Sequence, residues 1–391
     1  MLNRITLILS FLVMGPLLSP RLSAKQVDQG TPKPTQKRLL SVEEWKTLDI
    51  SCKRGLDFLI SQQQKDGSFP TLPIGQPGVT ALVTLAFAAH GHLPGEGPYG
   101  KELSKAIDYI LATQRDNGLI YDHAVGGNGP LQPHPMEHAT GVAGAYCHAI
   151  SGLALSELYG MPNEHTQRLK GAIEKGIQAT LTMQKWRKNR QDRGGWRYLH
   201  QFELTSSDLS LAGWNISFLR SAKNAGFDVS EKAIREGVEY VLRCYNPKKR
   251  AFQYKLQPTN RQNRAMAGVG ILALAHAGKH KRPEAKTAAL WVLKRGFQEY
   301  NQVRPADQGR YAGERYHYGV FHCSLAMYQM GGRYWKEFFS PTSKTLLENQ
   351  NEDGSWDPES LHDGQFGNSY TTALVVLALG APNQLLPIYQ R

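Results

Sequence analysis

The sequence predicts an all-α fold made of six helical hairpins. Three observations support this prediction: one motif recurs along the chain, amphipathic segments alternate with almost wholly apolar ones, and glycines follow the apolar segments. The chain has 391 residues, of which 41% are hydrophobic and 20% charged, as in ordinary folded proteins. This length exceeds one ordinary core, so we expect two domains or one domain built from repeats.

The recurring motif consists of a basic and a small residue, an aromatic–aliphatic pair, and then Gln, Gly and an aromatic residue. Residues 54–69 fill every position, residues 105–120 follow closely, and residues 350–356 repeat its end. In the third copy an insertion separates Gln184 from Gly194. The fourth and fifth copies are degenerate. We expect the Gln to bond unpaired backbone groups at a helix end and the Gly to permit the turn.

An apolar segment rich in Ala and Leu follows each copy of the motif, and this composition favours helix. Gly at the end of such a segment suits a left-handed helix cap. The amphipathic segments should lie outside, and the segments that are apolar all round should be buried. These buried segments are residues 78–91, 139–160, 208–226, 265–278, 319–331 and 371–380.

The Gln-x3-Gly-x-aromatic motif resembles the repeat of squalene and hopene cyclases, which also recurs in protein prenyltransferase β subunits. Residues 63–69, 114–118 and 350–356 match best. The resemblance implies an (α/α)6 toroid, with the inner helices around a central cavity, over residues 45–391. It implies a terpenoid-cyclase-like or prenyltransferase-like protein. It does not define an activity, because one fold hosts unrelated chemistries.

The N-terminal region is set apart from the repeats. Residues 1–24 have a basic start, an apolar run too short to span a membrane, and a candidate cleavage site, which together predict a signal peptide. Residues 25–44 are polar and contain two prolines, which is typical of a disordered linker. We therefore expect a secreted or periplasmic protein with no transmembrane span in the mature chain.

Charge and cysteine content narrow the expected partners. The net charge of +13 favours acidic partners, such as anionic lipid headgroups or acidic glycans. The basic residues are spread among the helical segments, which is also typical of a solvated face. No nucleic-acid-binding motif is present, so nucleic acid is not an expected partner. The four cysteines are widely spaced, which predicts buried free thiols.

Candidate site residues lie at or near the start of the apolar segments, where the inner helices of a ring enter the cavity. We expect removal of a group that lines this cavity to cost less than about 1 kcal/mol of stability. The catalytic candidates are Asp208, Tyr316 and His317. The candidate ligand-binding residues are His138, Tyr146, Trp214, Asn215, Arg264, Tyr318, His322, Asn368 and Tyr370.

The motifs that the resemblance implies are incomplete. Triterpene cyclases protonate an alkene with an Asp-x-Asp-Asp motif, which is absent; Asp208 stands alone, where an Asp is also an ordinary N-cap. His317 matches the zinc-binding His of prenyltransferases by position, but the partner Asp-x-Cys is missing. We therefore expect no cofactor, with zinc as the less favoured alternative.

Three functions stay open. The first is a cavity that binds an isoprenoid or another apolar ligand, with or without catalysis, because aromatic side chains suit such a pocket. The second is a carbohydrate-active enzyme, a lyase or a glycosidase, on the same ring; suitable residue types are supplied by Arg315, Tyr316, His317 and Asn368. The third is a non-catalytic scaffold or binding module.

Overall fold

The computed structural model describes residues 39–122, 135–159, 165–199, 206–256, 262–302, 315–359 and 362–391, without the side chains of 135–140, 362 and 363. The predicted signal peptide (1–24) and the predicted linker as far as residue 38 lie outside the described residues. The first helix begins at Val42, slightly before the predicted start of the repeats at residue 45.

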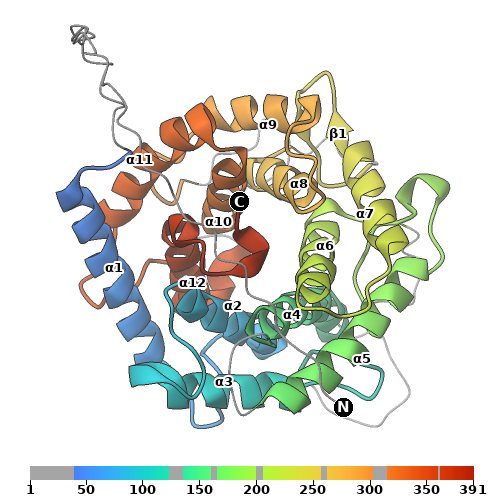
Figure 1. The fold of residues 1–391 in the computed structure, drawn as a ribbon, viewed down its shortest axis with the longest axis horizontal. Coiled ribbons are helices and arrows are strands. Elements are labelled where there is room, and N and C mark those ends of the chain that lie inside the picture. The colour runs from blue at the N-terminus through green and yellow to red at the C-terminus, as the bar shows by residue number, and fades with distance from the viewer. Residues whose placement is uncertain are drawn as a thin grey trace, which may run out of the picture. The chain divides into compact units, whose positions relative to one another are not determined.

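Twelve α-helices in the described residues alternate between an outer and an inner ring (Figure 1). The outer helices are α1 (Val42–Ser61), α3 (Gly100–Ala112), α5 (Thr166–Lys185), α7 (Glu231–Arg243), α9 (Pro283–Leu293) and α11 (Gly332–Glu348). The inner helices are α2 (Gln76–Ala88), α4 (Pro135–Tyr159), α6 (Leu209–Asn224), α8 (Arg264–His276), α10 (Tyr316–Met330) and α12 (Gly367–Leu379).

Short elements lie in the connections between these helices. A two-stranded antiparallel pair, β1 (Tyr245–Asn246) and β2 (Ala251–Phe252), follows α7. The 3-10 turns are η1 (Pro73–Gly75), η2 (Gly97–Tyr99), η3 (Arg190–Asp192), η4 (His362–Phe366), η5 (Ala381–Asn383) and η6 (Pro387–Tyr389). Among the described residues, no helix combines the length and the apolar character that crossing a bilayer requires.

Burial separates the two kinds of helix as the sequence predicts. Every residue of α2 after its first is buried, whereas α1 buries only one face. The inner helices contact one another in chain order, and α12 packs against α2. The all-α class is confirmed. The closest hairpin partners, however, are an inner helix and the outer helix that follows it, with α12 against α1. The connections from inner to outer helix are the shorter ones, which explains this pairing.

Glutamine side chains join successive outer helices, and we call this contact the glutamine bridge. Its amide nitrogen, Nε2, donates to the carbonyl of the motif glycine and to a carbonyl of the next outer helix. Just after α1, Gln63 bonds Gly67 O at 3.1 Å and Glu102 O at 2.8 Å. Equivalent bridges are made by Gln114 to Gly118 and Ala172, by Gln184 to Gly194 and Ala233, and by Gln350 to Gly354 and Ser51. The last one closes the ring.

Each bridge requires a glycine beside it. Gly354 has φ of +90°, and a Cβ there would overlap the carbonyl oxygen of Arg54 in α1. Gly67, Gly118 and Gly194 share the positive φ and the same close approach to the next outer helix. In the degenerate fourth copy, the Tyr245 hydroxyl lies 2.7 Å from Thr287 Oγ1 of α9, and so replaces the bridge.

Gly354→Ala should destabilise the fold by about 2 kcal/mol or more, because Ala is strained at positive φ and its Cβ has no space. The matched control is Gly171→Ala in α5, where a Cβ would enter open space. That variant should gain about 0.5–1 kcal/mol from the helix preference of Ala. Urea unfolding of both variants measures the difference. Equal stabilities would contradict the role assigned to Gly354.

The last residues of the chain cover the C-terminal ends of the inner helices. In Figure 1 the chain ends over the centre of the ring. Glu157 of α4 is buried and accepts hydrogen bonds from Ser221 Oγ at 2.5 Å and from the Ile388 N–H at 3.2 Å. Gln329 Nε2 of α10 donates to Tyr389 O at 2.6 Å. Burial raises the pKa of Glu157 to about 7.

The raised pKa of Glu157 predicts a pH dependence of stability. The folded state holds this proton more tightly than the unfolded state, so the contribution is full below pH 4.5 and is lost as pH rises through 7. The loss should approach about 3 kcal/mol. The Glu157→Gln variant should not show this loss of stability, because glutamine does not titrate.

Burial lowers the pKa values of His148, His276 and His322 to about 4, 3 and 3. These histidines therefore reduce the stability of the folded state as the pH falls below 6.5, which is opposite to the effect of Glu157. The quantity to measure is therefore the difference in unfolding free energy between the Glu157→Gln variant and the parent protein at each pH. A difference that stays constant from pH 4.5 to 8 would refute the assignment.

Candidate functional site

A central cavity of about 460 Å³ lies at the N-terminal ends of the inner helices. All six inner helices or the turns just before them contribute to its wall. Its apolar lining includes Val79, Leu82, Ile150, Met266 and Leu374. The inner helices supply such a lining because they are apolar on every side.

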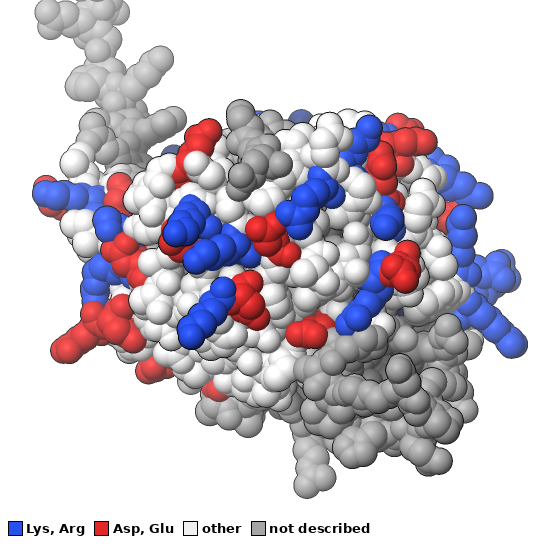
Figure 2. Space-filling model, turned by 90° about the horizontal axis from the view of Figure 1, so that it is seen from below, with Lys and Arg blue, Asp and Glu red and all other residues white. Residues whose placement is uncertain are grey.

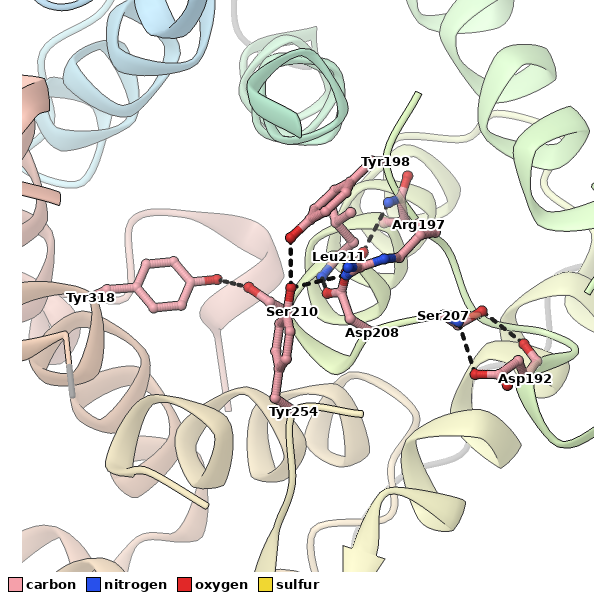
Figure 3. Close-up of polar contacts among 10 residues, drawn as sticks. Asp192, Arg197, Tyr198, Ser207, Asp208, Ser210, Leu211, Tyr254 and Tyr318 are labelled. Carbon is pink, nitrogen blue, oxygen red and sulfur yellow. Dashed lines mark hydrogen bonds and ion pairs between the residues drawn. The ribbon is translucent and has the colours of Figure 1, made fainter. Parts of the chain in front are cut away.

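Four of the candidate ligand-binding residues line this cavity: Tyr146, Trp214, Tyr318 and Tyr370. Tyr318 of α10 is fixed by α6, because its hydroxyl lies 2.6 Å from Ser210 Oγ and accepts from Trp214 Nε1 at 2.8 Å. Figure 3 shows the Tyr318 and Ser210 side chains directed toward each other. The cavity wall between α6 and α10 is therefore held by direct hydrogen bonds.

Three further residues at this wall were not predicted: Arg197, Tyr198 and Tyr254. The hydroxyls of Tyr198 and Tyr254, which both line the cavity, lie 2.9 Å apart. Arg197 donates to the Tyr254 hydroxyl at 2.9 Å, and its guanidinium carbon lies 3.7 Å from the Tyr198 ring centre (Figure 3). A usable signal exists in the sequence, because each Tyr follows the buried aromatic residue of its copy, Trp196 or Phe252, by two positions.

Asp208 anchors this group and does not itself line the cavity. Its carboxylate is fully buried, accepts the Leu211 N–H at 2.8 Å as the N-cap of α6, and forms an ion pair with Arg197. Both carboxylate oxygens are therefore engaged as acceptors. This is the N-cap alternative considered for Asp208, with an Arg added, and a carboxylate held in this way caps α6 and orients Arg197.

The tyrosine hydroxyls at the cavity are neutral hydrogen-bonding groups. Burial raises the pKa of Tyr146, Tyr198, Tyr254, Tyr318 and Tyr370 above the usual value for a phenol. Nearby Asp208 adds to the rise for the first four of them. The wall can therefore donate hydrogen bonds to a polar group on a ligand at physiological pH, without carrying phenolate charge.

Tyr316 and His317 begin the same helix as Tyr318 but lie outside the cavity lining. The Tyr316 hydroxyl donates to Phe297 O at 2.9 Å. The backbone N–H of His317 donates to Glu359 Oε1 at 2.8 Å, and its imidazole Nε2 lies 3.3 Å from the Tyr300 hydroxyl. Both side chains are completely buried. They join α10 to the neighbouring loops, which is a structural arrangement.

The remaining candidates also make structural contacts. Arg264 donates to the Gly296 carbonyl at 2.5 Å, just after α9. His322 Nδ1 lies 3.0 Å from Tyr318 O, and burial lowers its pKa to about 3, so the ring is neutral. Asn215 and Asn368 bond Leu211 O and Ser355 Oγ. The side chain of His138 lies outside the described residues. Among the described residues, no three His, Cys, Asp or Glu side chains are placed to hold a metal ion.

All four cysteines, Cys52, Cys147, Cys244 and Cys323, are buried free thiols, as the sequence predicts. Cys147 is the one among them that lines the cavity. Burial raises its pKa to about 12, so it is an unreactive thiol in the wall.

No protein-family model matches the sequence, and no curated protein matches it. Solved structures do match. A variant of type II terpene cyclase MstE from Scytonema, in complex with its substrate geranylgeranyl dihydroxybenzoate, has a TM-score of 0.57 and 14% identity, over 89% of this chain and 100% of the cyclase. Cellobiose 2-epimerase from Bacillus thermoamylovorans has a TM-score of 0.57 and 11% identity, over 86% and 100%.

An alpha-amylase from Clostridium perfringens is also similar, with a TM-score of 0.55 and 12% identity over 85% of this chain and 97% of its own. Identities this low show a shared fold alone. They support the terpenoid-cyclase type of fold that the repeat motif predicts, without singling out squalene cyclases. The same ring also carries carbohydrate enzymes.

Asp208→Ala should destabilise the protein by about 3–5 kcal/mol, because it leaves Arg197 buried without its counter-charge and removes the cap of α6. This destabilisation is larger than the cost below about 1 kcal/mol that the sequence predicts for a side chain lining the cavity. Exposed Asp228→Ala is the control and should stay within about 0.5 kcal/mol of the parent. Chemical denaturation measures both variants. An Asp208→Ala protein as stable as the control would exclude the anchoring role.

Proposed function

We propose that the central cavity binds an apolar ligand of the isoprenoid type. The observation that carries this proposal is the lining: aliphatic and aromatic side chains dominate it, and a few hydroxyls gather at one wall. A volume of about 460 Å³ is within the roughly 300–1,000 Å³ usual for small-molecule pockets. Two of the terpene cyclase structures that share this fold are complexes, one with the substrate geranylgeranyl dihydroxybenzoate and one with the product merosterolic acid A.

Several polar groups gather at one wall of the lining, whereas the opposite part is largely apolar. The hydroxyls of Tyr198, Tyr254 and Tyr318 meet near the start of α6 (Figure 3). The wall formed by η1, α2 and α12 is contributed largely by apolar residues, such as Ile74, Leu82 and Leu374. A ligand with one polar end and a hydrocarbon chain would match this division. The polar end would accept hydrogen bonds at α6, and the chain would lie against α2 and α12.

The proposal covers binding and does not include protonation of an alkene by an acidic motif. Among the described lining residues there is no carboxylate, and the neighbouring Asp208 is held by Arg197 and Leu211. The same observation places a carbohydrate-active enzyme second, because an inverting glycosidase needs two carboxyl groups about 6.5–9.5 Å apart.

We also infer export to the periplasm or the medium, on the basis of residues 1–24 alone. N-terminal sequencing of protein recovered outside the cytoplasm tests this inference. A chain that begins close to residue 25 would support it. An intact Met1 on a protein retained in the cytoplasm would contradict it.

The binding test uses farnesol and, for comparison, cellobiose, measured by isothermal titration. Farnesol should bind, and Ala143→Phe should weaken this binding about tenfold or more, because Ala143 lines the cavity and the larger ring occupies its volume. Ala112→Phe makes the same change at an exposed position of α3 and should bind as the parent does. Native extraction followed by mass spectrometry identifies any ligand already bound.

Three outcomes would overturn the proposal. Binding of cellobiose in preference to farnesol would favour the carbohydrate-active alternative. A protein that binds neither and is purified empty would favour the scaffold alternative. Farnesol binding that Ala143→Phe leaves unchanged would place the ligand outside the cavity.

A further inference from the structure

The third copy of the motif contains an insertion that the ring does not need. Three residues separate Gln from Gly in the first, second and sixth copies, whereas nine separate Gln184 from Gly194. The glutamine bridge is nevertheless intact, with Gln184 Nε2 2.8 Å from both Gly194 O and Ala233 O. The inserted stretch therefore has a role other than joining the outer helices, and in repeat proteins such insertions often form the binding face.

The insertion is basic, and a second basic segment lies against it. Residues 185–193 contain five Lys or Arg side chains, and residues 243–250, from the end of α7 through the β1–β2 turn, contain four. Arg243 joins the two segments, because its guanidinium donates to Gln191 O at 2.8 Å and also to Arg193 O. We call these two segments together the basic edge.

Eight of the nine basic side chains of the basic edge are exposed. The exception is Lys188, which is half-buried and donates to Met183 O and Gln184 O at the end of α5. The exposed residues are Lys185, Arg187, Arg190, Arg193, Arg243, Lys248, Lys249 and Arg250. In Figure 2, Lys and Arg side chains project at the edge on the side of α5 and α7, while blue and red alternate elsewhere on that face.

No ion pair within the described residues neutralises these charges. The single acidic residue of the basic edge, Asp192, is buried and accepts the Ser207 N–H at 2.8 Å. Some surface cations elsewhere are paired, as in Lys53–Asp57 and Lys223–Glu231, both at 2.6 Å. The basic edge carries nine cations and one carboxylate in a chain whose net charge is +13, so it holds most of the excess charge.

We propose that the basic edge binds a linear acidic polysaccharide. Five of the eight exposed cations are Arg, whose planar guanidinium matches carboxylate and sulfate groups in a bidentate manner. Like charges at this density repel one another and are relieved by a polyanion. The predicted signal peptide places the chain where such glycans occur. This surface lies on the outer ring and does not depend on the ligand proposed for the cavity.

A membrane surface fits the basic edge less well. Stable attachment to a bilayer usually combines basic residues with an apolar anchor. Among the described residues, the exposed large hydrophobic side chains are Val42, Ile50, Leu290 and Leu385, and none of them belongs to the basic edge. Binding by the basic edge should therefore be electrostatic, and it should weaken strongly as salt screens the charges.

The test compares two triple variants with the same change of net charge. Arg187→Glu, Arg190→Glu and Lys249→Glu alter the basic edge, where these three side chains make no hydrogen bond in the described structure. Lys46→Glu, Lys65→Glu and Lys336→Glu alter exposed residues of α1, its following loop and α11, on the other side of the ring. Thermal unfolding should show that both variants fold like the parent.

Binding to heparin is measured by isothermal titration at 0.15 M NaCl. The basic-edge variant should bind at least about tenfold more weakly, and the control variant should stay close to the parent. Equal weakening of both variants would show that net charge alone acts, and no weakening would exclude the basic edge. Tighter binding of the parent to phosphatidylglycerol vesicles or to duplex DNA than to heparin would overturn the choice of a polysaccharide.

Discussion

The fold depends on the glutamine bridge between successive outer helices. One amide group uses both of its N–H donors, one on its own loop and one on the next outer helix, and each accepting carbonyl lies near a glycine that leaves room for the approach. The contact between Gln350 and Ser51 joins segments 299 residues apart and closes the ring. Each bridge also fixes the point from which the chain turns inward, so the positions of the inner helices and of the cavity follow from it.

The sequence could predict this framework because its signals are local and periodic. A Gln, a Gly and an aromatic residue at fixed spacing mark the bridge, and an apolar segment marks each inner helix. The uniform apolar character of the inner helices, however, gives no indication of which side chains face the cavity. A helix that is apolar on every side has no polar stripe to fix its rotation, so sequence could not show that Tyr318 faces the cavity while Tyr316 and His317, one or two residues away, face the neighbouring loops.

The group around Arg197 could not be predicted for a different reason. By sequence alone Asp208 is an N-cap or a candidate acid, and only the structure shows that it caps α6 and pairs with Arg197 across a turn. A buried ion pair brings little net stability, because desolvation offsets the attraction between the charges. Its effect here is orientation. Arg197 is held beside Tyr198 and Tyr254, so two neutral hydroxyls are fixed at the cavity wall.

Both proposed binding sites arise where the repeat departs from its own pattern. The insertion after Gln184 carries the basic edge on the outside, and the chain that continues past Gly194 brings Arg197 and Tyr198 to the cavity. In the fourth copy, Tyr245 replaces the bridging Gln, and Tyr254 follows a few residues later. The regular copies need their residues for the ring itself. The third and fourth copies maintain their contact with the next outer helix by extra length or by other means, and they add Tyr198 and Tyr254 to a cavity that all six inner helices or the turns before them line.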